Sequence, residues 1–160
     1  MASTSTTAPI MTTRQFFQSW QGHRALTRRV IDAFPEDKLF SYAIGGMRPF
    51  SALAMELIAM AVPTLRGVLL GDWKQLTDAK ATTKAELLGM WDEATAQINA
   101  LWHLIPAARF QEVETAFGQW KMPVYDLLLY VRDNEIHHRG QGYVYLRSLG
   151  IEPPPFWERG

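Results

Sequence analysis

The stretch from Pro123 to Gly150 reads PVYDLLLYVRDNEIHHRGQGYVYLRSLG. Its first apolar residues recur at three- and four-residue spacing: Val124, Leu127, Leu128 and Val131. This spacing places them on one face of a helix. Proline is favoured at the first helical position and glycine just past the last one, and prolines 153–155 prevent the helix from continuing. The stretch therefore predicts a long helix with one buried face.

Polar residues continue this face into the C-terminal half of the predicted helix. Steps of three and four residues from Val131 reach Asn134, His138, Gln141 and Tyr145. An i, i+4 pair such as Asn134 and His138 projects two side chains toward one point, which is the geometry of helical metal sites. A buried polar network that only fixes the register of the helices would explain the same pattern.

Three other segments have helical periodicity, and no segment alternates convincingly as a strand does. Pro63 ends or kinks the second of them, and residues 36–47, between the first two, form a loop. Together the four helices predict an all-α fold, an antiparallel four-helix bundle. The three segments begin at Thr12 or Thr13, at Arg48–Pro49 and at the capping box of residues 83–86, and they end at Phe34, beyond Val62 and at Pro106.

The length of 160 residues fits one domain that spans residues 1–160. Within it, the first nine residues are small and polar, and we expect residues 1–10 to be a flexible N-terminus. Residues 151–160 form a C-terminal tail, and we expect this tail, with Phe156 and Trp157, to pack back onto the bundle.

Composition limits the classes of function. Sixteen basic and sixteen acidic residues cancel, so the sequence favours neither nucleic acid nor an anionic membrane as a partner. The chain has no cysteine, which excludes disulfides, thiolate metal sites and a cysteine nucleophile. There is no signal-like N-terminus, and the apolar stretch from Pro49 to Leu65 is shorter than the roughly 20 residues of a membrane span. We expect a soluble, cytoplasmic protein.

Glu56 is the only charged residue between Pro49 and Leu65. A carboxylate in so apolar a helix must be paired, protonated or bound to a metal ion if it is buried. Glu56 would then complete a three-ligand set with Asn134 and His138 from the neighbouring helix. Two alternatives stay open at this point: a structural network of these residues with Gln141, and a Glu56 that lies on a narrow exposed stripe.

The neighbours of His138 are expected to point elsewhere. His137 is rotated by about 100° from His138 and is placed at the edge of the bundle, near Asp133. Glu135 and Arg139 are expected to form an i, i+4 ion pair on the outer face of the helix.

Two glycines and two histidines need a separate explanation. Gly140 and Gly142 each cost about 1 kcal/mol within a helix, which suggests close approach by another helix or by a second subunit. His23 and His103 are single histidines on apolar helices, and we expect each to be a hydrogen-bonded core or boundary residue.

The run His137-His138-Arg139-Gly140-Gln141, continued by Tyr145-Leu146-Arg147, Gly150 and Pro153-Pro154, resembles the last helix of the DinB-like family, also called the DinB/YfiT-like metalloenzymes. Arg48-Pro49-Phe50 is similar to the family's entry into its second helix, and Lys121-Met122-Pro123 to the start of its fourth. The resemblance extends over essentially the whole chain.

This resemblance implies a four-helix bundle of the DinB/YfiT-like type, a homodimer, and a divalent metal ion at the centre of the bundle. Family members supply three histidines, one from the second helix and two spaced H-x-x-x-H on the fourth. These positions fall on Glu56, Asn134 and His138, so only one of the three is histidine here. The set is richer in oxygen, and we expect nickel or zinc, with iron or manganese as alternatives.

The resemblance also implies a reaction on a small-molecule substrate. Some relatives are thiol-dependent transferases or isomerases in which the metal activates a low-molecular-weight thiol cosubstrate, and a hydrolase on the same ligands is a second possibility. Gln141, His137 and Tyr145 are further candidate pocket residues. The alternative is a non-catalytic dimeric helical protein of a stress- or DNA-damage-inducible family, whose buried polar cluster is structural.

Overall fold

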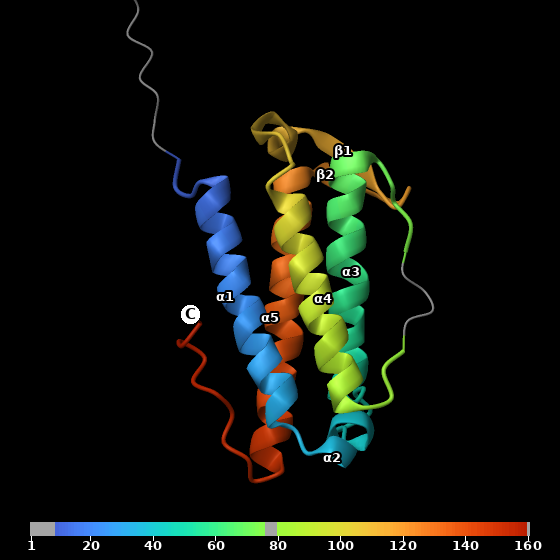
Figure 1. Cartoon of the computed structure of the whole chain (residues 1–160), viewed down its shortest axis with the longest axis vertical. Helices are drawn as coiled ribbons and strands as arrows, with labels where there is room; N and C mark the ends of the chain where they lie inside the picture. The colour runs from blue at the N-terminus through green and yellow to red at the C-terminus, as the bar shows by residue number, and fades with distance from the viewer. Residues whose placement is uncertain (1–8, 76–79, 160) are drawn as a thin grey trace, which may run out of the picture.

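The computed structural model describes residues 9–75 and 80–159. Four long helices run nearly parallel to one axis, and a short helix, a 3-10 turn and a two-stranded hairpin lie at the ends (Figure 1). The all-α bundle predicted from the sequence is confirmed. The elements are α1 (Thr13–Ala33), α2 (Glu36–Ser41), α3 (Phe50–Leu70), α4 (Lys84–Trp102), η1 (Ala107–Gln111), β1 (Val113–Ala116), β2 (Trp120–Pro123) and α5 (Val124–Ser148).

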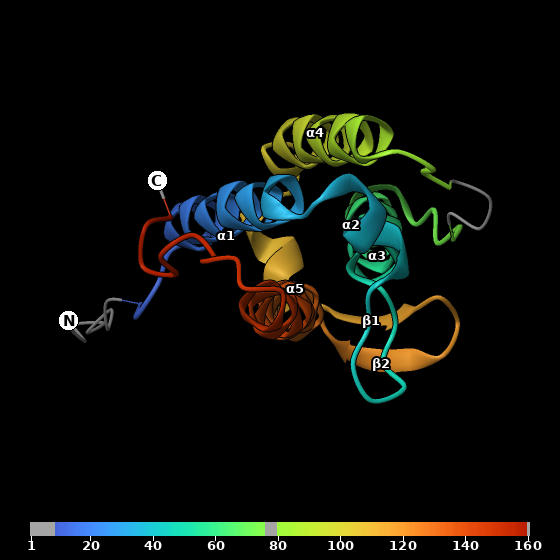
Figure 2. The same cartoon turned by 90° about the horizontal axis from the view of Figure 1, so that it is seen from below.

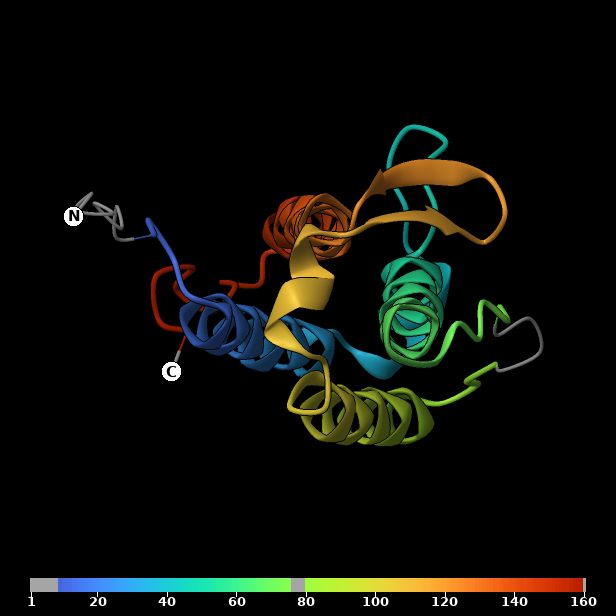
Figure 3. The same ribbon diagram turned by 90° about the horizontal axis from the view of Figure 1, so that it is seen from above.

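The four long helices form a ring in which α1 lies between α4 and α5, and α3 lies on the opposite side between the same two helices (Figures 2 and 3). In Figure 1, α1 and α5 run downward while α3 and α4 run upward. The antiparallel arrangement expected from the sequence therefore holds for the neighbouring pairs α1–α4 and α3–α5. It is wrong for α3–α4 and α1–α5, which run parallel. Since α3 ends and α4 begins at opposite ends of the bundle, the connection between these two neighbours has to span its length.

Helix ends follow their local sequence. Thr12 caps α1 in a capping box with Gln15, and Thr83 caps α4 in the predicted box with Glu86. Pro63 does not end α3, which continues to Leu70 and stops at a glycine in the left-handed conformation, Gly71.

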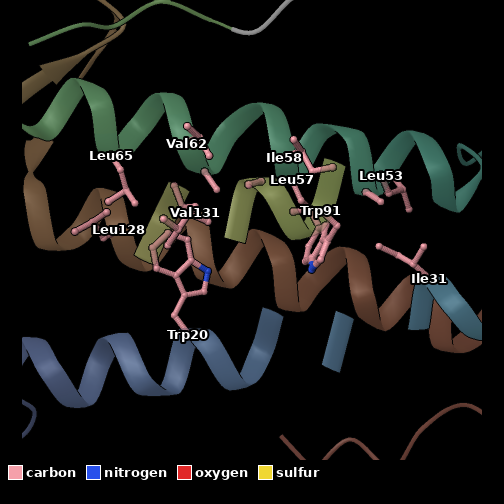
Figure 4. Packing of buried hydrophobic residues seen from close by; sticks show 14 of the residues in the cluster. Trp20, Ile31, Leu53, Leu57, Ile58, Val62, Leu65, Trp91, Leu128 and Val131 are labelled. Carbon is pink, nitrogen blue, oxygen red and sulfur yellow. The ribbon is translucent and has the colours of Figure 1, made fainter. Parts of the chain in front are cut away.

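The core lies between α1, α3, α4 and α5, where two tryptophans with almost no exposed surface fill the bundle from neighbouring helices. Trp20 comes from α1 and Trp91 from α4 (Figure 4). Aliphatic residues of α3 and α5 pack around them, which removes large apolar areas from water. Those labelled in Figure 4 include Leu53, Leu57, Ile58, Val62, Leu65, Leu128 and Val131.

Among the described residues, α3 is the one helix long and apolar enough to cross a membrane by composition, with a mean hydropathy of 1.7. The helix is longer than the apolar stretch from Pro49 to Leu65 suggested, because it continues to Leu70. In the structure, 61% of its most apolar window is buried inside the bundle. Its apolar character is accounted for by its position as a core helix.

The two glycines of α5 have different surroundings. A Cβ atom on Gly142 would lie 2.5 Å from the Phe50 ring, so glycine is needed for the close approach of α3 and α5. A Cβ atom on Gly140 would meet nothing within 4 Å. The expected approach of another helix is thus found at Gly142 and not at Gly140.

Glu135 and Arg139 are not an exposed pair, as the sequence suggested, because both side chains are buried against α1. Glu135 Oε1 accepts a hydrogen bond from Thr27 Oγ1 at 2.7 Å, and its other oxygen lies 3.6 Å from Arg24 Nη1. Arg139 Nη1 donates to the Thr27 hydroxyl at 3.1 Å. Helical spacing alone gives the relative direction of two side chains but not which face meets the next helix.

Burial dominates the electrostatics of this network. It raises the pKa of the Glu135 carboxyl group, and the Arg24 charge opposes the shift. Arg24 is also anchored by Thr95 Oγ1 at 2.8 Å and stacks 3.8 Å above the Trp91 ring, so α1, α4 and α5 meet at one point. A buried ion pair of this kind is held by its hydrogen bonds as much as by its charges.

The hairpin of β1 and β2 was not predicted. Its antiparallel register pairs Val113 with Pro123 and Ala116 with Trp120, and it packs beside α3 and α5 at one end of the bundle (Figures 2 and 3). The four-residue strands have one buried residue between them, Ala116, which leaves no alternation for sequence analysis to detect. The predicted loop at residues 36–47 likewise contains a short helix, α2.

The C-terminal tail packs back along α1 and α5, as expected (Figure 1). Tyr143 donates to the Pro154 carbonyl at 2.7 Å, and an Arg159 guanidinium nitrogen lies 3.1 Å from His23 Nε2. Phe156 and Trp157, however, remain 66% and 68% exposed, so the tail is held by polar contacts rather than by its aromatic rings. The flexible N-terminus predicted for residues 1–10 lies mostly outside the described residues.

Replacing Glu135 with glutamine should lower the free energy of unfolding by about 3–5 kcal/mol, because Arg24 and Arg139 would remain buried without a counter-charge. Urea denaturation measures the change. Glu93→Gln, at an exposed position of α4, serves as the matched control and should have little effect. A loss no larger than that of the control would contradict this account of the network.

Burial and the neighbouring charges of Arg139 and Arg159 lower the pKa of His23 to about 4, whereas in an unfolded chain it is about 6.5. Between these pH values the unfolded state binds more protons, so stability should fall as the pH falls through this window. We expect wild type to lose roughly 2 kcal/mol more than His23→Gln between pH 6.5 and 4.5. Parallel urea titrations of both proteins that give equal slopes would show that His23 does not carry this effect.

Candidate functional site

Glu56, Asn134 and His138 lie together across the interface of α3 and α5. Glu56 Oε1 is 3.0 Å from His138 Nε2 and 3.4 Å from Asn134 Nδ2. The antiparallel packing of α3 against α5 brings Glu56 to the level of this i, i+4 pair. The three residues singled out by the sequence thus form one cluster, which is half-buried at Glu56 and buried at His138. Their assignment as metal ligands stays a prediction.

Gln141 completes the surroundings of the imidazole ring. Its side-chain oxygen lies 2.8 Å from His138 Nδ1, one turn along α5. When Nδ1 carries a proton and donates it to Gln141, the lone pair of the neutral ring is on Nε2, which faces Glu56. This hydrogen bond therefore fixes the direction of the ring and leaves Nε2 as the nitrogen available to a ligand.

Arg48 is the residue of this cluster that sequence analysis did not assign to it. Its guanidinium Nη2 lies 2.6 Å from Glu56 Oε2 and forms an ion pair at the solvent-facing side of the carboxylate. Arg48 precedes α3, within the Arg48-Pro49-Phe50 motif. Seven residues separate Arg48 from Glu56 in the sequence, and they gave no sign of this contact.

The ionisation of Glu56 results from opposing effects. Partial burial would raise the pKa of its carboxyl group, but hydrogen bonds from Arg48 and His138 and the charge of Arg48 outweigh it, so the pKa lies below its usual value. Glu56 is therefore a carboxylate at neutral pH. Its carboxylate pairs with the Arg48 guanidinium group on one side and faces His138 and Asn134 on the side of α5.

Of the other candidate pocket residues, Tyr145 supports the cluster and His137 lies outside it. The Tyr145 hydroxyl donates to the backbone carbonyl of Arg48 at 2.9 Å and so holds the segment that carries the guanidinium. His137 is exposed, and its ring stands beside that of His138 with 5.1 Å between centroids. His103 is exposed at the end of α4, and His23 belongs to the Arg139 network.

The donor set fits a divalent metal ion with two firm ligands. Two ligands of one ion at about 2.1 Å stand roughly 3.0–3.4 Å apart, which matches the separation of Glu56 Oε1 and His138 Nε2. The Asn134 amide can turn its oxygen toward the same point, because a rotation of the amide group by 180° exchanges the positions of its oxygen and nitrogen. Among the described residues, no group of three or more His, Cys, Asp or Glu could hold a metal ion, so any ion here would depend on the amide and on outside ligands.

Comparisons with known proteins agree with this architecture. The family model described as the DinB family matches residues 3–159. A DinB-like protein from Bacillus subtilis is similar in structure with a TM-score of 0.71 and 16% sequence identity, over 91% of this chain and 99% of that chain. A DinB-like protein from Bacillus cereus gives a TM-score of 0.73 and 23% identity, over 90% of this chain and 97% of that one.

No curated protein matches the chain. The two structural likenesses, at low identity, concern the fold, while the family model covers nearly the whole sequence. The chain belongs to the DinB family.

Proposed function

We propose that this DinB-family protein binds a divalent metal ion between Glu56 and His138 and uses it to activate a small molecule. The observation that supports this is the 3.0 Å approach of His138 Nε2 to Glu56 Oε1 while Nδ1 faces the Gln141 oxygen. With Nδ1 protonated, two lone pairs face each other across this gap. A metal ion or an additional proton is needed between them.

The residues around the ion would have separate roles. Glu56 and His138 would hold it, and the Asn134 amide oxygen would be a weaker third ligand. Gln141 would keep Nε2 directed at the ion, and Arg48 would hold the second carboxylate oxygen, so that Glu56 binds through Oε1 alone. Oxygen and imidazole ligands of this kind suit nickel or zinc, with iron or manganese as alternatives.

A bound ion would supply a Lewis acid that lowers the pKa of a coordinated thiol or water. With few protein ligands, positions remain open for a small molecule, which is the condition for catalysis rather than for a structural metal. We therefore propose a thiol-dependent transferase, with a hydrolase on the same ligands as the other enzymatic possibility. The chain's own contribution is to place and neutralise the carboxylate and to orient the ring.

A second candidate is a non-catalytic protein whose cluster is structural. The specific observation in its favour is the 2.6 Å ion pair of Arg48 and Glu56, which already neutralises the carboxylate without a metal. If the ring is neutral with its proton on Nε2, His138 donates to Glu56 and the Gln141 amide nitrogen donates to Nδ1. Both ring nitrogens of His138 and the Glu56 carboxylate then have partners within the protein.

Metal titration of two adjacent histidine variants separates these candidates. Wild type should bind roughly one zinc or nickel ion per chain, and His138→Ala should lose it. His137→Ala, one residue away and exposed, is the matched control and should bind as wild type does. Isothermal titration calorimetry and elemental analysis of chelator-free protein provide the readouts.

Absence of metal binding in wild type would contradict the metalloprotein and favour the structural cluster. In that case His138→Ala should lower the free energy of unfolding by about 1–3 kcal/mol, because Glu56 loses a buried partner. Equal loss of metal in His137→Ala and His138→Ala would likewise show that the ion is not held at Nε2 of His138.

We further propose that the protein is a homodimer that pairs through the outer face of α5. Ile136 and Val144 are exposed on this face, one turn to either side of Gly140, whose Cβ position is open. An exposed glycine within a helix costs stability unless another surface packs closely against it. A second copy of the chain would provide that surface.

Sedimentation velocity tests the dimer. Wild type should sediment as a dimer at micromolar concentration, and Val144→Lys should shift it to monomer, because a charge would be buried at the interface. Leu104→Lys, at an exposed apolar residue away from α5, should leave the dimer unchanged. A wild-type monomer, or equal dissociation by both lysine variants, would contradict the proposed interface.

A further inference from the structure

Two adjoining hollows lie where the hairpin meets α3 and α5, close to the Glu56 cluster. Each has a volume of about 220 Å³. Met60, Phe117 and Trp120 line both hollows, Thr64 and Tyr130 line the first, and Glu56 lines the second. Met60 also contacts the cluster, with its sulfur 3.7 Å from Asn134 Nδ2. The hollows therefore form one continuous surface that leads from an apolar end to the polar site.

The apolar end has the size of a small aromatic group. A cavity of about 150 Å³ lined by apolar side chains accommodates a benzene molecule, so a hollow of about 220 Å³ takes a ring with a substituent. Its walls are aromatic and thioether side chains, which contact flat rings favourably. Polar groups are few, as in most small-molecule sites.

Thr64 supplies an independent sign that this hollow receives a ligand. Its side chain is 1% exposed, and within the described part of the chain its hydroxyl has no hydrogen-bond partner. A buried hydroxyl without a partner is costly, and each such group in a native protein calls for an explanation. Pro63, immediately before it, also has no N–H to donate to the carbonyl of Ala59, a residue of the second hollow.

Phe117 is held in a strained conformation over the same hollows. Its φ of 52° is unusual for any residue except glycine, and it is followed by Gly118 at φ 70°. Turns with two positive φ values favour Asn-Gly, so phenylalanine is strained at this position. The ring packs edge-on against Trp73 and Trp120, at 5.3 Å and 6.2 Å between centroids, which keeps it on the hollows.

We infer that the substrate of this site carries a small uncharged aromatic group, which occupies the hollow between Met60, Phe117 and Trp120 and exchanges a hydrogen bond with the Thr64 hydroxyl. The rest of the substrate extends past Met60 to Glu56 and His138. This inference rests on the proposed function, because it names the substrate class of the same site. The binding of the aromatic group itself does not require the metal ion.

2-Naphthol is a suitable probe, because it represents the buried end alone: an uncharged ring system with one hydroxyl group. Isothermal titration calorimetry of the full chain should show one binding site, with or without a chelator present. Thr64→Val should weaken binding by about 5- to 10-fold, the effect of one hydrogen bond. The same variant should raise the melting temperature, because an unsatisfied buried hydroxyl is replaced by a methyl group of the same shape.

A pair of tryptophan variants locates the probe. Trp120→Ala should abolish binding because it removes a wall of both hollows. Trp157→Ala, at an exposed tryptophan of the tail, should bind as wild type does. Circular dichroism confirms that each variant is folded before its affinity is interpreted.

Several results would overturn the inference: no binding to wild type at millimolar 2-naphthol, equal affinity of Thr64→Val and wild type, or equal losses in the two tryptophan variants. Dissociation of a wild-type dimer by Trp120→Ala would overturn it too, since a second copy of the chain would then occupy the surface. Loss of zinc binding with intact 2-naphthol binding contradicts the proposed metal alone. Zinc binding without 2-naphthol binding contradicts this inference alone.

Discussion

The buried carboxylate of Glu135 ties α5 to α1, and the rest of the structure depends on the rotation of α5 that this contact fixes. Thr27, Trp20 and Arg24 surround it, and Arg139, one turn later, reaches the same side. If α5 rotated away from α1, a buried charge would lose its partners, which costs far more free energy than a shift between two apolar surfaces. The polar network therefore selects one face of α5 for α1.

The candidate site follows from that choice. Residues 134 and 138 each precede a member of the buried pair, so they are rotated by about 100° from it and face α3. On α3, Glu56, the only acidic residue of a long apolar helix, lies at the matching level. Gly142 allows α3 and α5 to approach closely, because the Phe50 ring occupies the position that a Cβ atom would take. Two separate polar networks thus lie on two sides of α5. The Glu135 network is buried, and we call it closed; the Glu56 cluster is half-buried, and we call it half-open.

The half-open network differs from the closed one in its access to small molecules. Glu56 borders an aromatic hollow, whereas Glu135 is almost completely buried. The hairpin that covers this hollow belongs to the connection between α4 and α5. Its strands are too short to show an alternation of apolar and polar residues in the sequence. Its effect is to bring Phe117 and Trp120, which are far from Glu56 in the sequence, to the edge of the site.

The sequence by itself determined the four helices, most of their ends and the grouping of Glu56, Asn134 and His138, because capping residues, prolines and apolar spacing act over a single turn or a few turns. It misplaced Glu135 and Arg139, since a charged i, i+4 pair reads as exposed until a neighbouring helix offers partners. It also missed Arg48 at Glu56 and the orphaned hydroxyl of Thr64. Only the tertiary structure decided these features, because they depend on which faces of α1, α3 and α5 meet and on what the hairpin covers.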